Sequence, residues 1–325
     1  MKQQAFEQAH GAFWSDFGAA LAALEQPGMG DPLGVSRLPE QYRRICHHLS
    51  LARERGYGVA LIDRLNGLAL RGHQRLYGVR GGTLLSALSF FSDFPSLVRK
   101  RWRAVALAGA LFYGPAVALT FGAKANPEIA YLTETPDELT SMESMYQSGK
   151  TKFGREAAAD TDVQMFGLYI WNNVRITFQC FASGLLAGLG PILFLFWNGA
   201  HGGAIAGYLT HQGLGMNFWS FVATHSALEL NSLVISGAGG LLLGWALLFP
   251  GRRGRKQALN LAAKEGLTLV MGAAVMDVGA ALFEAFWSSS AAVPPTVKFA
   301  VAGGLWTLTL LYFLAVGHRR SAQDA

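Results

Sequence analysis

Charged residues are scarce in this chain of 325 residues: they make up 15% of it, whereas soluble chains carry about 25%. Cysteine is scarce too, because only Cys46 and Cys180 are present. Cys46 falls in a polar part and Cys180 in an apolar run, so we expect no disulfide between them. The first 102 residues have no unbroken apolar core of the kind that a signal peptide needs. These shortages argue against an ordinary soluble protein.

Several motifs of nucleotide and hydrolase chemistry are missing as well. No Walker A motif, nucleophile elbow or dinucleotide fingerprint occurs, so an ATPase that energised the protein would be a separate chain. The net charge of +6 and the pI near 9.4 come mainly from short basic clusters, which contact with anionic lipid explains better than nucleic acid does. We therefore expect a lipid bilayer as partner and no nucleic acid.

Long apolar runs dominate what is present. Apolar residues make up 51% of the chain, mean hydropathy is +0.26, and residues 104–123 contain no charge. A bilayer-spanning helix needs about 20 such residues. The sequence predicts an all-α polytopic membrane protein with about six transmembrane helices, near residues 104–123, 167–188, 190–210, 219–249, 267–287 and 296–317.

The positions of lysine and arginine predict the orientation. Basic clusters at 99–103, 251–256 and 318–320 all fall on one side if there are six spans. Residues 124–165 carry eight acidic and four basic residues, as suits an outer loop. We therefore expect both termini in the cytoplasm.

The polar N-terminal part predicts a separate region. Helical periodicity over 2–25 and 39–77, interrupted by a Pro/Gly-rich connection, predicts a helical cytosolic domain over 1–82. An interfacial helix over 83–102 follows, although this stretch could equally belong to the cytosolic core. The six-helix bundle occupies 103–318 and a cytosolic tail 319–325.

Polar residues recur within the predicted spans. Ionised side chains in hydrocarbon cost about 2.5–3.5 kcal/mol each and usually face the interior of a bundle, so we expect these residues to converge on one polar centre in the outer half of the bilayer. Arg175 is the basic residue well inside a span, and Glu229, Asp277 and Glu284 are its candidate counter-charges. The predicted centre comprises Asn172, Asn173, Arg175, Asn198, His201, His225, Glu229, Asp277 and Glu284.

Three roles remain open for this centre: a structural lock, a cavity for a ligand or ion, and a catalytic site. His225 and Glu229 lie one turn apart on a helix, and His201 or Glu284 could supply a third metal ligand. The H-x-x-x-E spacing is common by chance. We therefore expect no cofactor, with zinc as the alternative.

Small residues recur at helix-packing spacing. Gly199, Gly203 and Gly207 repeat every four residues, as do Ser236, Gly240 and Gly244, and Gly184 with Gly188. Such ridges let helix backbones approach closely. These ridges serve either packing within the chain or contact between two copies of it, and we expect a homodimer.

The order of these elements resembles the SpoIIM family, named for stage II sporulation protein M. The resemblance rests on "YIWNNVRITFQCFASGLLAGLGPILFLFWNGAHGG" (169–203), "HSALELNSLVISGAGGLLLG" (225–244) and Glu284, while residues 42–77 resemble the longer proteobacterial members. It implies a bacterial inner-membrane scaffold in cell-envelope (peptidoglycan) remodelling, with envelope membrane proteins and a MoxR-type ATPase as partners. The alternatives are a permease or lipid-handling protein, and a metal-dependent membrane hydrolase at His225 and Glu229.

Overall fold

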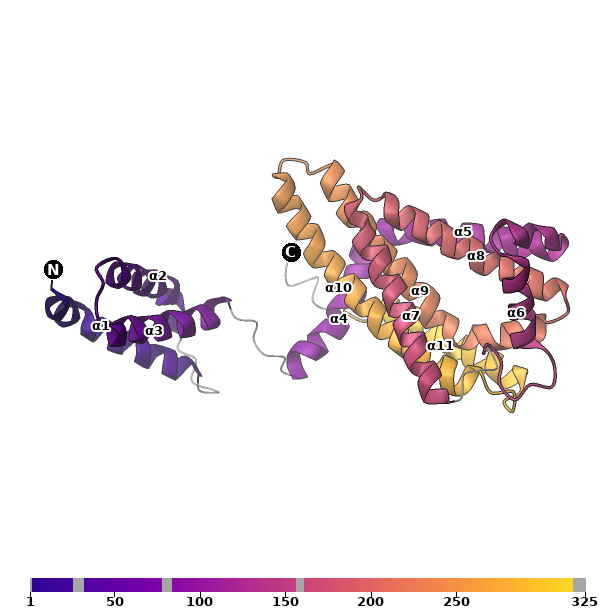
Figure 1. Cartoon of the computed structure of the whole chain (residues 1–325), viewed down its shortest axis with the longest axis horizontal. Helices are drawn as coiled ribbons and strands as arrows, with labels where there is room; N and C mark the ends of the chain where they lie inside the picture. The colour runs from indigo at the N-terminus through magenta and orange to yellow at the C-terminus, as the bar shows by residue number, and fades with distance from the viewer. Residues whose placement is uncertain (1, 26–31, 78–83, 156–160, 318–325) are drawn as a thin grey trace. The chain divides into compact units, whose positions relative to one another are not determined.

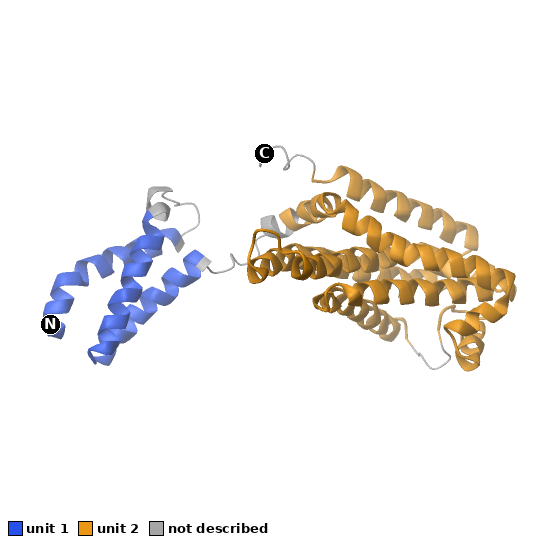
Figure 2. Cartoon of the chain, turned by 90° about the horizontal axis from the view of Figure 1, so that it is seen from above, with its two compact units in different colours: residues 1–87 blue, residues 88–325 orange. Residues whose placement is uncertain are grey.

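The chain folds into two compact helical units in a computed structural model. The structure describes residues 2–25, 32–77, 84–155 and 161–317, and every element within these ranges is a helix (Figure 1). Unit 1 is Met1–Ala87 and unit 2 is Leu88–Ala325 (Figure 2). The basic cluster predicted at 318–320 and the tail at 319–325 lie outside the described residues.

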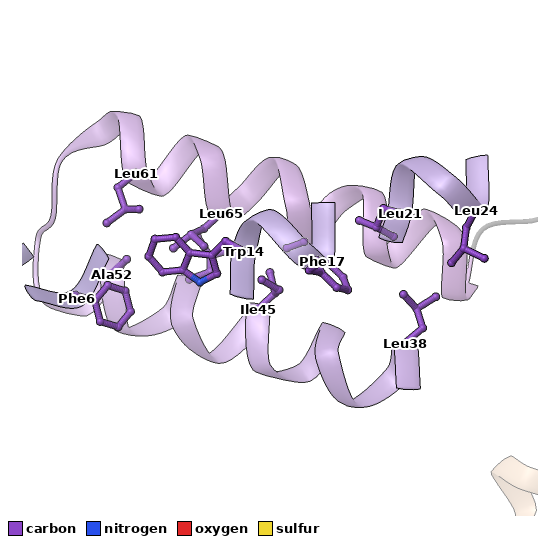
Figure 3. Close-up of a cluster of buried hydrophobic side chains, with 12 residues drawn as sticks. Phe6, Trp14, Phe17, Leu21, Leu24, Leu38, Ile45, Ala52, Leu61 and Leu65 are labelled. Carbon is purple, nitrogen blue, oxygen red and sulfur yellow. The ribbon is translucent and has the colours of Figure 1, made fainter. Parts of the chain in front are cut away.

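Unit 1 consists of α1 (Gln3–Glu25), α2 (Pro32–Glu54) and α3 (Val59–Tyr77). Each helix has large apolar residues at spacings of three and four, so one face of each helix can be buried. Figure 3 shows these side chains pointing between the helices, with Trp14 and Ile45 in the middle. Trp14, Phe17, Leu21, Ile45 and Leu65 are at most 1% exposed. Leu61, Leu65 and Leu68 lie on the face of α3 that packs on this core.

The boundaries in unit 1 differ from those predicted. The periodicity over 39–77 is divided between α2 and α3 by a turn, in which Gly56 has a φ of +60° that side chains rarely adopt. Helix α2 also begins earlier than predicted and contains Pro39. Helical periodicity alone does not register a break when the apolar spacing continues across it.

Unit 2 is a helical bundle around one long helix. Helix α9 contacts α5, α7, α8, α10 and α11. A short π-helix, η3, continues α10 without a break. The elements of unit 2 are α4 (Leu84–Lys100, whose first turn belongs to unit 1), α5 (Trp102–Ala125), η1 (Pro127–Leu132), α6 (Pro136–Tyr146), α7 (Asp162–Ala182), η2 (Ser183–Leu185), α8 (Leu189–His211), α9 (Gly215–Leu248), α10 (Arg255–Leu282), η3 (Phe283–Ser288) and α11 (Pro295–Ala315).

Among the described residues, four helices are long and apolar enough to cross a membrane. They are Trp102–Ala125, Gly215–Leu248, Arg255–Ser288 and Pro295–Ala315. The other two predicted spans are present as helices, α7 and α8, in which asparagine, arginine, glutamine and histidine interrupt the apolar residues, and neither is among these four. A membrane-embedded helical bundle is therefore supported, whereas the predicted count of six is not confirmed.

The glycine ridges are used within the chain. A Cβ added to Gly203 would lie 2.2 Å from the carbonyl oxygen of Ala116, so α5 and α8 touch through their backbones, and the two helices lie side by side in Figure 1. A Cβ added to Gly184 would lie 2.2 Å from the oxygen of Gly240, and one on Gly244 would lie 2.3 Å from Gly188 Cα. These ridges are therefore buried and provide no surface for the homodimer that we expected from them.

Candidate functional site

A cavity of about 360 Å³ lies between α5, α7, α8, α9 and α10. Six of the nine residues of the predicted polar centre line it, together with Thr177 and Ser232. The six are Asn172, Asn173, Asn198, His201, Glu229 and Asp277. The structure therefore brings together polar residues from four helices that are far apart in the sequence.

Helices α9 and α10 contribute the acidic residues that line the cavity, Glu229 and Asp277. Asp277 is 1% exposed, and one of its carboxylate oxygens accepts a hydrogen bond from the Ser232 hydroxyl. Ser232 Oγ also lies 2.7 Å from the backbone oxygen of Glu229. On the α7 side, Ser236 donates to the backbone oxygen of Thr177 at 2.6 Å. These bonds fix α7, α9 and α10 around the cavity.

His225, Glu229 and Glu284 form a second cluster that shares Glu229 with the cavity. One potential ligand atom from each side chain lies within 4.8 Å of the other two. His225 Nε2 is 3.5 Å from Glu229 Oε2, and His225 Nδ1 is 3.2 Å from Ser288 Oγ. His225 is 3% exposed and Glu284 is 8% exposed. The pairing of His225 and Glu229 expected from their spacing is therefore present, with Glu284 beside it.

The π-helical turn positions Glu284. In a π-helix each turn holds one extra residue, and such turns are frequent at functional sites. Here η3 buries Glu284, Ala285 and Ser288 against the rest of the bundle. Ser288 contacts His225 while Glu284 joins the same cluster, so this single turn of η3 supplies both groups.

Arg175 does not belong to the centre. Its side chain is exposed and makes no ion pair with any residue that the structure describes, and Gln179 on the same face is also exposed. The face of α7 that turns inward carries Asn173, Thr177 and Cys180, which are all buried. The pattern of polar residues in the sequence did not tell which face of α7 packs on α9.

Two buried cations near the centre come from positions that the sequence did not suggest. Arg155, in the segment before α7, donates to the backbone oxygen of Ala285 at 2.6 Å and pairs with Asp162 at 2.7 Å. Lys298, at the start of α11, is 1% exposed and donates to the backbone oxygen of Ser288 at 2.7 Å. Arg155 lies outside the apolar runs and Lys298 lies at the very start of the last one, so hydropathy gave no signal for their burial.

A second acid–histidine pair lies at the rim of the cavity. His201 Nδ1 is 2.6 Å from Glu134 Oε1, and the side chain of Glu134 is 2% exposed. Glu134 lies just before α6, which begins with a capping box. The backbone N–H and the hydroxyl of Thr135 both donate to the carboxylate of Glu138, and these bonds lower the pKa of Glu138. His201 is thereby linked to the segment that precedes α6 rather than to His225.

These features define a helical integral membrane protein with a buried acid–histidine centre. Residues 103–289 match the family model of Stage II sporulation protein M (SpoIIM), and residues 4–78 match that of a Domain of unknown function (DUF8413). The SpoIIM match covers more than half of the chain, so the chain belongs to the SpoIIM family, and the resemblance found in the sequence is confirmed. No curated protein and no solved structure gives a significant match.

Proposed function

We propose that the chain is a scaffold of the bacterial inner membrane in cell-envelope remodelling, with six spans and both termini in the cytoplasm. The observation that best supports the scaffold role is a folded outer segment, residues 126–155, fastened to the end of the bundle. Tyr208 donates to Glu143 at 2.6 Å, and Asn217 donates to the backbone oxygen of Tyr146 at 2.8 Å. Glu134 pairs with His201 and Arg155 donates to the backbone oxygen of Ala285, which fastens the segment further. A segment fixed in this way offers a rigid surface to a partner protein.

The directions of the helices support six spans. Along α5 and α8 the contacts advance together, from Phe112 with Gly199 to Thr120 with Gly207, so these helices are parallel. Thr177 of α7 meets Ser236 of α9, and Gly184 of η2, just after α7, meets Gly240 of α9, so α7 and α9 are parallel too. Helices α7 and α8 have 21 and 23 residues, which is long enough to cross a bilayer. Two parallel pairs require the chain to cross the bundle between α5 and α9 twice, through α7 and α8.

The charges at the two ends support the orientation. Arg101 pairs with Glu265 at 2.5 Å, and Arg99 donates to the backbone oxygen of Val316 at 2.7 Å. The basic junction of α4 and α5, the N-terminal part of α10 and the end of α11 therefore share one end of the bundle. Clusters of lysine and arginine favour the cytoplasmic side. The outer segment with its acidic residues then lies outside.

The scaffold role is tested by photo-crosslinking in cells. A crosslinking amino acid at Leu132, which is 74% exposed on the outer segment, is expected to capture peptidoglycan-modifying enzymes. The same probe at Leu308, which is 64% exposed on α11, is expected to capture lipid. A probe at Leu132 that captures no envelope enzyme, while the probe at Leu308 reacts, contradicts the proposal, as does peptidoglycan hydrolysis by the purified protein.

The cavity favours a second candidate, a permease or lipid-handling protein. A volume of about 360 Å³ lies within the range of sites for small molecules, roughly 300–1,000 Å³. Its polar wall suits a small polar solute or a lipid headgroup. Purified protein in vesicles would then move such a solute or lipid, and Asp277→Asn would slow the movement. Vesicles that transport neither one remove this candidate.

A further inference from the structure

The cluster of His225, Glu229 and Glu284 has the geometry of three ligands around one ion. Two of them come from successive turns of α9 and the third from η3, and their ligand atoms lie within 4.8 Å of one another. A tetrahedral zinc site with bonds of about 2.0–2.2 Å requires ligand atoms about 3.4 Å apart. The distance of 3.5 Å between His225 Nε2 and Glu229 Oε2 already meets this requirement. Glu284 needs only a small side-chain movement.

The imidazole of His225 is oriented as a metal ligand is. Metal-binding histidines use one ring nitrogen for the ion and engage the other in a hydrogen bond that fixes the ring. Here Nδ1 is engaged by Ser288 Oγ at 3.2 Å, while Nε2 is the nitrogen that faces Glu229. The edge of the ring packs against Phe221, with centroids 5.1 Å apart at 74°. The ring is therefore held with Nε2 toward the carboxylate of Glu229.

The hydrogen bonds of the cluster leave an oxygen unsatisfied. Glu284 Oε2 is fully buried and has no hydrogen-bond partner among the described residues. Buried polar atoms are nearly always hydrogen-bonded, because an unpaired one costs about 1–3 kcal/mol and a charged one more. A purely structural lock would have satisfied this oxygen. It indicates instead a partner of another kind in the cluster.

The charges point to a cation as that partner. Glu229 and Glu284 share the cluster, and Asp277 lies close by on the cavity wall. The nearest buried guanidinium, that of Arg155, is already paired with Asp162. The ammonium of Lys298 is bonded to the backbone oxygen of Ser288. The carboxylates therefore outnumber the cations that reach them, and a divalent ion would balance the excess.

We propose that His225, Glu229 and Glu284 bind one divalent transition-metal ion, for which zinc fits the donor set of one imidazole nitrogen and two carboxylate oxygens. Because Glu229 also lines the cavity, the ion lies at the cavity wall. Three protein ligands leave the fourth position of zinc open, so an oxygen-containing ligand in the cavity can bind there. This site is independent of the scaffold role.

The test measures metal binding by the full-length protein in detergent, purified without a histidine tag and stripped with a chelator. Titration with Zn²⁺ is expected to give one tightly bound ion per chain. Glu284→Gln keeps the size of the side chain and removes its charge, and it is expected to weaken zinc binding by at least about 100-fold. The matched control is Glu134→Gln, the same change at a buried carboxylate outside the cluster, which is expected to bind as the wild type does.

Two further measurements keep the result decisive. His47→Ala removes an exposed imidazole of unit 1 and is expected to leave the tight site unchanged. If Glu284→Gln does not fold, X-ray absorption spectroscopy of the zinc-loaded wild type identifies the ligands. One imidazole ligand with only oxygen ligands besides it supports the site. A sulfur ligand or several imidazole ligands overturn it. Absence of a stoichiometric ion in the wild type, or equal affinity of Glu284→Gln and wild type, also overturns it.

Discussion

Unit 1 and unit 2 are both built of helices, but small residues take a much larger share of the interior in unit 2. The core of unit 1 contains large side chains such as Trp14, Phe17 and Ile45. In unit 2, the buried residues of α9 include many serines, alanines and glycines, while Leu308 and Leu314 of α11 are each 64% exposed. Water drives large apolar side chains inside, whereas lipid gives them no reason to leave the surface. Close backbone contact and polar bonds therefore contribute more to the cohesion of unit 2 than to that of unit 1.

The largest expected effect comes from a substitution in the core of unit 1. Trp14→Ala leaves a cavity among Phe6, Ile45 and Leu65 and should cost about 3–5 kcal/mol of the free energy of unfolding. Limited proteolysis of the full chain should then cleave unit 1 and spare unit 2. Trp171→Ala removes the same side chain where it is 66% exposed, on α7, and should leave the melting temperature nearly unchanged.

A smaller effect is expected from a single methyl group in unit 2. Gly203→Ala places a Cβ 2.2 Å from the oxygen of Ala116 and should destabilise the bundle by about 1–3 kcal/mol, because the α5 backbone must move. Gly202→Ala is the control, since a Cβ there meets nothing within 4 Å. Thermal unfolding in detergent compares the two variants. Equal melting temperatures would contradict close backbone packing as the source of cohesion.

The stability of unit 1 should depend on pH through His48. This histidine is 4% exposed and accepts a hydrogen bond from Trp14 at 2.9 Å. Burial, followed by the nearby His10, Arg44 and His47, lowers its pKa from 6.5 to about 4. The unfolded chain therefore binds the proton first, so stability is complete above pH 6.5 and falls as the pH drops toward 4, by roughly 1–2 kcal/mol.

Denaturant unfolding of the fragment 1–87 measures this dependence, because Trp14 is its single tryptophan. His48→Gln should remove most of the slope between pH 6.5 and 4. A wild-type fragment that is equally stable at both ends of this range would show that the imidazole is not buried in its neutral form.

The smallest expected effect is a gain in unit 1. Gly67 lies on the exposed face of α3, and a Cβ there meets nothing within 4 Å. Gly67→Ala should stabilise unit 1 by about 0.5–1 kcal/mol, because alanine is the better helix former. The midpoint of denaturation reports the change. A loss of stability would indicate a contact of α3 outside the described residues.

The sequence predicted the positions of the helices better than it predicted which of their faces and residues pack together. The apolar runs located all six long helices of unit 2, and the intramembrane cost of polar groups predicted that residues from four helices converge. It failed for Arg175, because the periodicity of α7 defines two candidate faces and only tertiary packing selects one. It also missed Arg155 and Lys298, whose burial depends on how the connecting segments fold over the bundle.

The bonds of Arg155 connect the segment before α7 to the cluster of His225, Glu229 and Glu284. Its guanidinium binds the same turn of η3 that carries Glu284 and Ser288. A protein that docks outside and pulls Arg155 away would shift this turn, and with it the spacing of the acid–histidine cluster. By thermodynamic reciprocity, an occupant of that cluster would then change the affinity of the docked protein by the same factor.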